Sequence, residues 1–390
     1  MSDPMEAVRR LLEMSHRARP EDLPIALRKI APLLDATEVV FYLVDYEQVA
    51  LRPLADTGHR GRRSVPVDGT EAGQAFCSGL PVRASDGSGH IWLPLLNGAE
   101  RLGVLDVHTA AAAGEHAVRD LRAVAAVVAE LVASRRFYGD AVEHTRRRMP
   151  MQLAAEIIWN QLPPLTFASH DAVVTAVLEP CYDVGGDAFD YAVNGDVLHV
   201  ALFDTVGHGI SASALTTLAV NSYRNARRCG LDLPDTYGSV DKWIRAQYPG
   251  SFVTAILAEL HTDSGVYRRI CAGHPAELLL RDGRLLRQLP GPSALPLGLG
   301  SMRSRPPEVT EEMLKPADSV LLYTDGVIEA RSADGEFFGI DRLAGLITEE
   351  LAGRAPAAET MRRMVHAILA HQHDELQDDA TAALLQFRPD

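Results

Sequence analysis

The sequence predicts an α+β protein built from two units with a helical segment between them. The chain has 390 residues, which is more than one ordinary hydrophobic core accommodates. Strand-like runs framed by helical patterns occupy the first part of the chain, and a second set of strand-like runs begins near residue 165. Several of these runs are joined by Asn-Gly or Asp-Gly turns, which favours antiparallel sheets.

The composition is that of an acidic globular protein. Hydrophobic residues make up 47% of the chain, and the formal net charge is -14. This charge argues against nucleic acid as a partner and suits carboxylate-rich cation sites. The four cysteines form no C-x-x-C pair and are interpreted as reduced thiols. No apolar run is long enough to span a membrane and residues 1–20 hold no signal-peptide core, so we expect a cytoplasmic protein without a membrane partner.

Residues 1–20 are predicted as an N-terminal helix, and residues 21–136 as a first domain. A helical pattern over Glu21–Leu34 opens the domain, three strand-like runs follow, and a second helical pattern closes it. The last two runs, His90–Leu96 and Leu102–His108, flank an Asn-Gly pair and predict a hairpin. We interpret the histidines at the ends of this hairpin, His90 and His108, as residues of the sheet rather than as ligands.

This order of elements, with the stretches EAGQAFCSGLPVRA and HIWLPLLNGAERLGVLDV, resembles a GAF domain, the small sensor fold of signalling proteins. A PAS-like fold is the alternative. The resemblance implies a sensor for a small ligand, but no residue identifies that ligand. Cys77, in the first stretch, is interpreted as a buried inert thiol rather than as a redox sensor.

Residues 137–164 are predicted as a helical linker. The pattern is helical almost throughout from Ala117 to Asn160, is interrupted at Pro150, resumes over Met151–Leu162 and stops at Pro163-Pro164. An apolar stripe marks the first half of this pattern and comprises Leu121, Val124, Val128, Leu131 and Val132. Such a stripe either pairs with its twin in a homodimer or packs the helix on its own domain. We favour the homodimer.

Residues 165–390 are predicted as a second domain of two packed sheets flanked by helices. Strand-like runs recur at Ala172–Glu179, Ala188–Val193, Val197–Phe203, Phe252–Leu260, Tyr267–Cys271, Ala276–Leu280, Ser319–Tyr323 and Ala380–Phe387. Helical patterns lie at Ser211–Arg228, Asp235–Gln247, Gly339–Leu351 and Ala357–His371. No G-x-G-x-x-G, P-loop or G-x-S-x-G pattern occurs, so the signatures of dinucleotide binding, NTP hydrolysis and serine hydrolases are missing.

Carboxylates stand where the apolar strands of this domain begin or end. Asp204 and Asp325 each follow a strand, Asp187 follows two glycines, and Asp378-Asp379 precedes the last strand. A single Asp at such a place can simply cap a helix, but the pattern recurs four times. A fold that gathers these ends makes an all-oxygen site of the kind that Mg²⁺ and Mn²⁺ prefer. Two such ions lower the pKa of a bound water, which can then attack phosphorus.

Seven stretches of the domain resemble the metal-dependent protein phosphatases, the PPM or protein phosphatase 2C superfamily, and in particular its bacterial SpoIIE-like branch. In order they are VGGDAFD, LFDTVGHGISASAL, FVTAILAEL, AGHPAELLL, PLGLG, LLYTDGVIEARSADGEFFG and DDATAALLQF. The resemblance covers about Leu162 to Asp390. It implies a PPM-type β-sandwich between helices, with two Mn²⁺ or Mg²⁺ ions in its cleft.

The resemblance also assigns roles. It implies four catalytic residues, Asp187, Asp204, Asp325 and Asp378. Asp204 would bridge both ions, the carbonyl group of Thr205 would ligate one of them, and Asp325 and Asp378 would ligate the other. Asp187 would act through water, and Asp379 would support the ligands from behind. The substrate cleft would include Gly186, Gly207, His208, Gly209 and His274, and no arginine is assigned to phosphate binding.

Two histidine signals are weighed separately. His274 matches a motif of the family, and two roles stay open for it, in the cleft or in a structural turn. His371 and His373 form a His-Gln-His stretch before the acidic end of the chain. We interpret this stretch as a solvated helix end rather than as a transition-metal site.

The sequence therefore predicts a cytoplasmic serine/threonine phosphoprotein phosphatase under the control of a GAF-like sensor. In the branch that it resembles, the substrate is usually a phosphorylated anti-sigma-factor antagonist of the STAS fold. Two alternatives remain at this point. One is a non-catalytic binding module with the same fold, and the other is a phosphatase of small phosphate esters.

Overall fold

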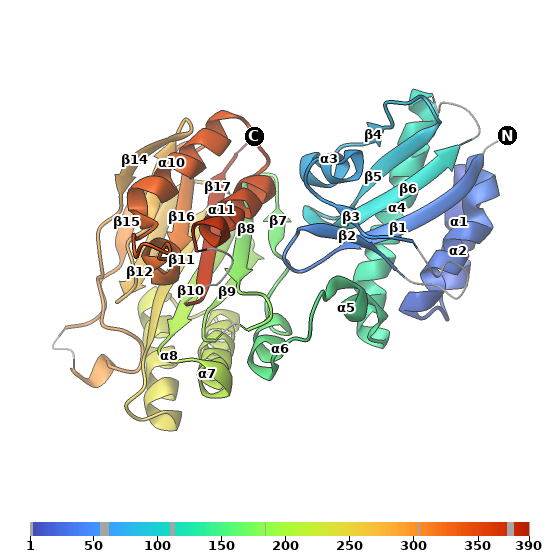
Figure 1. Cartoon of the computed structure of the whole chain (residues 1–390). Helices are drawn as coiled ribbons and strands as arrows, with labels where there is room; N and C mark the ends of the chain where they lie inside the picture. Colours follow the sequence, from blue (N-terminus) through green and yellow to red (C-terminus); the bar gives the residue numbers. More distant parts are fainter. Residues whose placement is uncertain are drawn as a thin grey trace. The chain divides into compact units, whose positions relative to one another are not determined.

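A computed structural model describes residues 3–54, 62–109, 114–183, 185–302, 305–372 and 378–389. The chain forms two compact units, residues 1–150 and 151–390 (Figure 1). The predicted linker, residues 137–164, is therefore divided between them.

The first unit is a six-stranded antiparallel sheet with helices on both faces. The strand order is β3-β2-β1-β6-β5-β4. The strands are β1 (Ala36–Val44), β2 (Ala50–Pro53), β3 (Val65–Pro66), β4 (Val82–Arg83), β5 (His90–Asn97) and β6 (Glu100–Thr109). The helices are α1 (Pro4–Ser15), α2 (Leu23–Ile30), α3 (Glu71–Ser78) and α4 (Glu115–Arg135), with short 3-10 turns η1 (Pro20–Asp22) and η2 (Ala31–Leu34) around α2.

Alternation along the strands gives this sheet two apolar faces. Phe41 and Leu105 belong to the face that packs against α1, α2 and α4. Tyr42, Trp92 and Val104 belong to the opposite face, which packs against α3. Figure 1 shows α3 on the side of the sheet away from the other three helices. The predicted arrangement of helix, antiparallel sheet and closing helix is found, and the GAF-like identity of the unit stays a prediction.

The segment from Ala117 to Asn160 is largely helical, as predicted, but the chain leaves the helix at more places than the predicted interruption at Pro150. After α4 the chain forms a 3-10 turn η3 (Arg136–Tyr138), α5 (Ala141–Arg146) and, beyond Pro150, α6 (Leu153–Trp159). The apolar stripe of α4 lies in the core of its own unit, with Val124 and Ala129 fully buried. The stripe thus packs the helix on its own domain, which is the alternative to pairing with a second copy. The homodimer stays a prediction, and the stripe does not support it.

The second unit contains two antiparallel sheets, in the orders β15-β12-β11-β10-β9 and β14-β13-β16-β17-β8-β7. The first sheet comprises β9 (Ala188–Asn194), β10 (Val197–Thr205), β11 (Val253–His261), β12 (Val266–Ala272) and β15 (Thr310–Met313). The second comprises β7 (Thr166–Ala168), β8 (Ala172–Glu179), β13 (Leu278–Arg281), β14 (Arg284–Gln288), β16 (Ser319–Tyr323) and β17 (Ala380–Phe387). The helices are α7 (Gly209–Arg228), α8 (Leu233–Gln247), α9 (Asp325–Glu329), α10 (Gly339–Ala352) and α11 (Ala357–His371), with a 3-10 turn η4 (Gly300–Met302).

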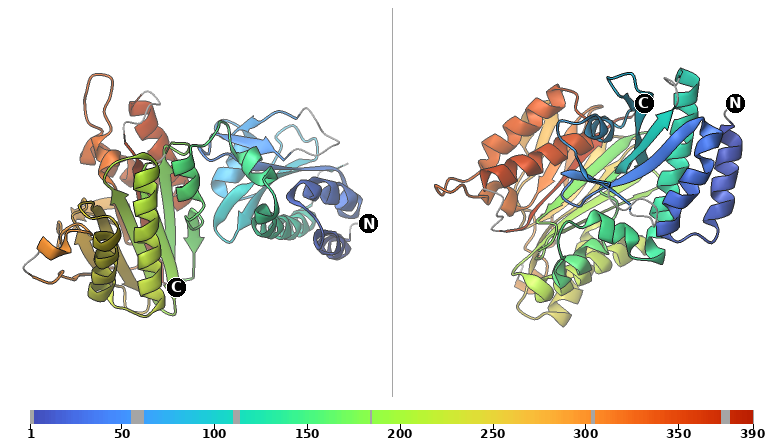
Figure 2. Two further views of the ribbon diagram at one scale, coloured as in Figure 1. Left: turned by 90° about the horizontal axis from the view of Figure 1, so that it is seen from below. Right: turned by 45° about the vertical axis from the view of Figure 1, so that its right-hand side comes forward.

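These elements form four layers, as predicted for this domain. Residues such as Val174, Leu202 and Val320 fill the space between the two sheets. On the outside, α7 and α8 pack against β10 and β11, whereas α10 and α11 pack against β16 and β17. Figure 2 shows the two helical layers on opposite sides of the sheets. Among the described residues, no helix is both long enough and apolar enough to cross a membrane.

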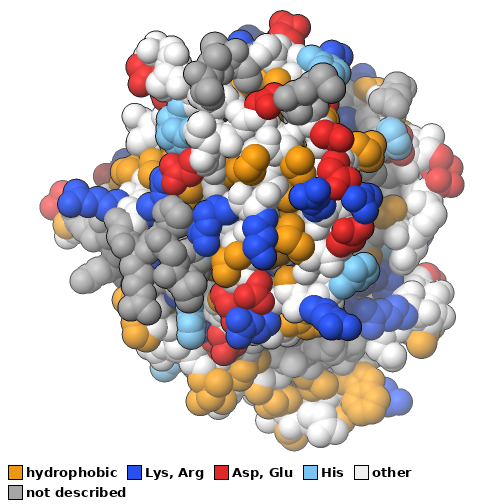
Figure 3. Space-filling view, turned by 90° about the vertical axis from the view of Figure 1, so that its right-hand side faces the viewer, with side chains coloured by type: hydrophobic (Ala, Val, Ile, Leu, Met, Phe, Trp, Pro, Cys, Tyr) orange, Lys and Arg blue, Asp and Glu red, His pale blue; other side chains and the backbone are white. Residues whose placement is uncertain are grey.

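Charge of both signs is mixed over the surface. On the face shown in Figure 3, Lys and Arg side chains lie among Asp and Glu side chains. Helix α1 illustrates the pattern, since Glu6 forms ion pairs with Arg9 and Arg10. Exposed pairs of this kind contribute little to stability, about 0–1 kcal/mol each.

Candidate functional site

Strand register brings the predicted acidic residues together in pairs. In the first sheet Ala188 of β9 is paired with Phe203 of β10, so Asp187 and Asp204 lie at the same end of two neighbouring strands. In the second sheet β16 ends where β17 begins, with Tyr323 paired with Ala382. Asp325 and the Asp378-Asp379 pair therefore lie at one end of that sheet.

The carboxylate of Asp379 joins the two sheets at this end. Its Oδ2 atom accepts hydrogen bonds from the backbone N–H groups of Gly185, Gly186 and Asp187, at 2.8, 2.6 and 3.2 Å. The loop before β9 is thus held on the start of β17. These bonds tie Asp379 to the backbone beside Asp187, and its predicted role behind the metal ligands stays a prediction.

A second link runs through Thr324. Its hydroxyl donates to Oδ2 of Asp187 over 2.8 Å and accepts from the backbone N–H of Thr381 over 3.0 Å. Asp187 is only 2% exposed, so this hydroxyl fixes the orientation of a buried carboxylate.

Two glycines allow the segments to approach one another. A Cβ atom at Gly186 would lie 2.6 Å from the carbonyl oxygen of Thr205, and one at Gly326 would lie 2.0 Å from that of Asp379. A larger residue at either position would push these segments apart. Close packing around the acidic residues therefore requires the glycine before Asp187 and the glycine after Asp325.

The carboxylates repel one another in the metal-free protein. Burial, with the charges of Asp325 and Asp378, raises the pKa of Asp204 to about 7. Burial and the nearby Asp204 raise the pKa of Asp187, and burial with Asp378 raises that of Asp325. Burial also raises the pKa of Asp379. A set of crowded oxygen ligands in this state fits a divalent cation, because the cation removes the repulsion.

His274 supports Asp204 from behind. The side chain is 1% exposed, and burial lowers its pKa to about 3, so the ring is neutral. Nε2 lies 3.1 Å from the carbonyl oxygen of Tyr323, which only accepts, so Nε2 carries the proton. Nδ1 then accepts from the hydroxyl of Thr254 at 2.9 Å. The same hydroxyl oxygen lies 3.3 Å from Oδ2 of Asp204 and accepts from Asp204 when that carboxyl is protonated, the form that its raised pKa favours. His274 is thus buried and hydrogen-bonded on both ring nitrogens, and its predicted place in the cleft stays a prediction.

The remaining predicted cleft residues lie on the outer side of the acidic group. Gly207 and His208 are exposed in the loop between β10 and α7, and Gly209 opens α7. Asp378 is also exposed, whereas Thr205 is buried. The acidic group is thus open to solvent at this loop and closed on the side of Asp187.

Two other expectations are settled by position. His371 hydrogen-bonds the carbonyl oxygen of Glu336 through Nε2 at 2.9 Å, and His373 lies outside the described residues. Cys77 is half-buried beside the core under α3, and its inert character stays a prediction.

Sequence reasoning missed the hydroxyl groups of Thr254 and Thr324 and the anchor of α7. Asp190 accepts hydrogen bonds from Arg224 and Arg227, at 2.7 and 2.8 Å for the shortest contacts. The second aspartate of the VGGDAFD stretch is this residue, so the motif already carried a signal. Asp190 ties α7 to β9 and is not part of the acidic group.

Comparisons with known proteins place the second unit. Residues 194–388, half of the chain, match the family described as Stage II sporulation protein E (SpoIIE). The chain is 22% identical over 215 residues to the phosphoserine phosphatase RsbU of Bacillus subtilis (strain 168), covering 55% of this chain and 62% of RsbU.

Solved structures with similarity include the RsbU and RsbW domains of Rv1364c from Mycobacterium tuberculosis, at 28% identity and a TM-score of 0.49, covering 56% of this chain and 62% of that one. The SiaA-PP2C domain of Pseudomonas aeruginosa has 22% identity and a TM-score of 0.48, covering 56% of this chain and 86% of that one. The chain thus spans less than two thirds of the length of RsbU and of the Rv1364c structure. With half of its length matched to one family, the chain belongs to the Stage II sporulation protein E (SpoIIE) family.

Proposed function

We propose that the protein is a Mn²⁺- or Mg²⁺-dependent phosphatase that removes phosphate from serine or threonine of a regulatory phosphoprotein. The observation that carries the proposal is the gathering of Asp187, Asp204, Asp325 and Asp378 at one end of two sheets. Membership of the SpoIIE family supports it, as does the similarity to a relative named as a phosphoserine phosphatase.

The acidic residues would hold two ions. Asp204 would bridge them, the carbonyl group of Thr205 would ligate one, and Asp325 and Asp378 would ligate the other, while Asp187 would act through water. When bound, such ions supply an activated water and neutralise charge on a phosphoryl group.

The rest of the site keeps these ligands in place. The carboxylate of Asp379 holds the loop by accepting hydrogen bonds from the backbone N–H groups of Gly185 and Gly186. Thr254 and His274 restrict the carboxylate of Asp204, and Thr324 restricts that of Asp187. Preorganised ligands of this kind need no rearrangement when an ion arrives.

We further propose a phosphorylated STAS-type anti-sigma-factor antagonist as the substrate and the GAF-like first unit as the sensor that controls the reaction. The exposed loop around His208 is the accessible side of the acidic group, where a side chain presented by another protein would approach. The excess of acidic residues gives no basis for a nucleic-acid substrate.

The proposal is tested by phosphate release from a phosphorylated STAS-type protein. We expect release with Mn²⁺, none with EDTA, and faster release from the phosphoprotein than from p-nitrophenyl phosphate at equal concentration. Turnover of the small ester alone would favour the ester phosphatase. Binding of the phosphoprotein without release, with Mn²⁺ present, would favour the non-catalytic module.

A further inference from the structure

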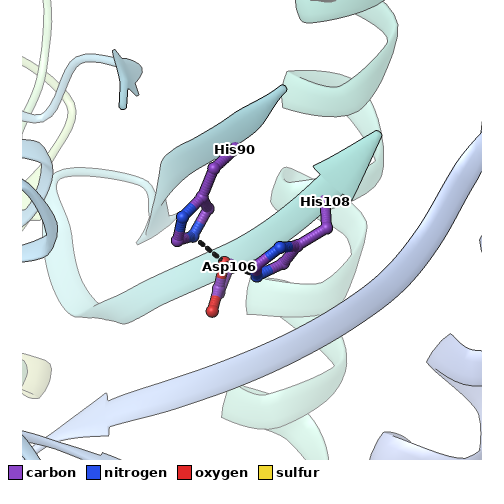
Figure 4. A group of neighbouring side chains, drawn as sticks. All are labelled: His90, Asp106 and His108. Carbon is purple, nitrogen blue, oxygen red and sulfur yellow. Dashed lines mark hydrogen bonds and ion pairs between the residues drawn. The ribbon is translucent and has the colours of Figure 1, made fainter. Parts of the chain in front are cut away.

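The hairpin of β5 and β6 brings two histidines and an aspartate to one place in the first unit. His90 is paired directly with His108, and Asp106 lies two residues before His108 on the same strand. Residues two apart on a strand share a face, so all three side chains lie on the α3 side of the sheet. Figure 4 shows them pointing toward one another from the two strands.

The three side chains converge on one carboxylate oxygen. Nε2 of His90 contacts Oδ1 of Asp106, and Nε2 of His108 lies 3.1 Å from the same atom. The two imidazole rings stack with centroids 4.0 Å apart. Each of the three residues offers one potential ligand atom, and these three atoms all lie within 4.8 Å of one another.

A histidine–aspartate pair accounts for His90 but leaves His108 unexplained. Nε2 of His108 is buried, and among the described residues it has no hydrogen-bond partner, because its approach to Asp106 lacks hydrogen-bond geometry. A buried polar atom without a partner is costly, and a cation shared by the three residues would give it one.

The surroundings favour a cation. The carboxylate of Asp106 is 3% exposed, and its other oxygen, Oδ2, lies 3.8 Å from the guanidinium of Arg62. Arg62 also pairs with Glu38, which lies opposite His108 on β1. The two carboxylates and one guanidinium leave a net negative charge beside two imidazoles. The side chains of His90 and His108 are 21% and 35% exposed, so the group lies near the surface although Nε2 of His108 is itself buried.

We propose that His90, Asp106 and His108 bind a divalent transition-metal ion, with Zn²⁺ as the ion that suits them first. Imidazole nitrogen with one carboxylate oxygen is a ligand set of zinc and its neighbours, whereas Mg²⁺ and Ca²⁺ take oxygen alone. The site is therefore distinct in chemistry from the all-oxygen group at Asp204. Three protein ligands leave one position of a tetrahedral ion for water or a small ligand. This proposal replaces the interpretation of His90 and His108 as sheet residues that bind no ligand.

The test is a titration of the full chain with Co²⁺, followed by visible absorption, in excess Mg²⁺ to occupy the all-oxygen site. We expect one equivalent of Co²⁺ with an absorption band that Zn²⁺ abolishes. His108→Asn and Asp106→Asn should weaken Co²⁺ binding by more than the roughly 10–100-fold that loss of an outer-shell partner costs. His116→Asn is the matched control, because His116 on α4 is 82% exposed. A band that survives in both ligand variants overturns the proposal.

A second measurement covers the case in which a variant fails to fold. Zinc-edge X-ray absorption of the unaltered chain, loaded with one equivalent of Zn²⁺ in excess Mg²⁺, should show two imidazole nitrogens at about 2.0–2.1 Å. Zinc surrounded only by oxygen, or no retained zinc, contradicts the site. Neither measurement uses phosphatase activity, so its result is independent of the proposed function.

Discussion

Asp204 is the residue whose environment does most to define the acidic group. It lies at the end of β10, and its carboxylate faces Thr254 on the neighbouring strand, which is in turn joined to His274. The chain from Tyr323 through His274 and Thr254 to Asp204 crosses from one sheet to the other. A ligand carboxylate supported in this way keeps one orientation before an ion binds.

Thr254→Val removes the hydroxyl from this chain while keeping the shape of the side chain. We expect Mn²⁺ affinity and turnover to fall by about 10–100-fold, the usual cost of losing a partner behind a metal ligand. Mn²⁺ titration by calorimetry and phosphate release measure the two effects. Thr262→Val is the control, since the Thr262 hydroxyl donates to a backbone carbonyl, that of Asp196, at 3.1 Å. Equal behaviour of the two variants would show that the chain does not support the site.

The sequence predicted the acidic residues better than their supports. Asp204 and Asp325 were found because each follows an apolar strand, and strand ends are visible as a change in pattern. Thr254 and Thr324 leave no such trace, because a threonine is an ordinary strand residue whose partners depend on register. His274 was singled out from its motif, but its burial and its hydrogen-bond partners become visible only in the three-dimensional structure.

Among the elements, α7 follows the loop after Asp204 and is anchored on β9. Asp190 on β9 is 2% exposed and pairs with Arg224 and Arg227, whose side chains are 17% and 7% exposed. The anchor holds the last turns of α7, whereas its first turn, at Gly209 and Ile210, follows the exposed loop after β10.

Asp190→Asn tests the anchor. Loss of the carboxylate leaves two largely buried guanidinium groups without a counter-charge, which typically costs about 3–5 kcal/mol. Urea unfolding gives the change in the free energy of unfolding. Glu311→Gln is the control, because it removes one side of an exposed pair with Arg268 and should cost no more than about 1 kcal/mol. A loss in Asp190→Asn as small as in the control would rule out the anchor.

The strands were predicted more reliably than the helical segment that joins the two units. Apolar runs such as Val197–Phe203 have one structural solution, a central strand. The stripe of Leu121 and Val124 suits either packing within its own domain or pairing with a second copy of the chain. No pattern in the sequence distinguishes these two arrangements. The position of His90 opposite His108 was within reach, because an Asn-Gly hairpin fixes the register of its strands to within a residue.

For the whole molecule, the acidic group links stability to pH and to metal. The pKa of Asp204 rises from 3.8 to about 7 on folding without metal. A carboxyl with a raised pKa stabilises the fold below its unfolded pKa, and this contribution is lost as pH rises through the folded value. We therefore expect the free energy of unfolding of the EDTA-treated protein to lose this contribution between about pH 4 and about pH 7.

Buried histidines act in the opposite direction, so the comparison has to cancel them. Burial lowers the pKa of His199 to about 4 and that of His274 to about 3, which adds stability as pH rises through 6.5. Urea unfolding of the wild type and of Asp204→Asn at each pH isolates the aspartate. The variant should lose less stability as pH rises, and Mn²⁺ should stabilise the wild type at neutral pH. Parallel pH curves for the two proteins would contradict the raised pKa.

The proposed catalytic metal site is tested by Mn²⁺-dependent phosphate release from a phosphorylated STAS-type protein, measured for two Asp→Asn variants. Asp204 and Asp196 lie at opposite ends of β10, the first in the acidic group and the second in an exposed turn. Asp204→Asn should abolish turnover, since a neutral amide does not bridge two cations, while the fold survives because carboxylate repulsion is relieved. Asp196→Asn should leave turnover unchanged. Near wild-type release by folded Asp204→Asn, with Mn²⁺ present, would contradict the assignment of the acidic strand ends as the catalytic metal site.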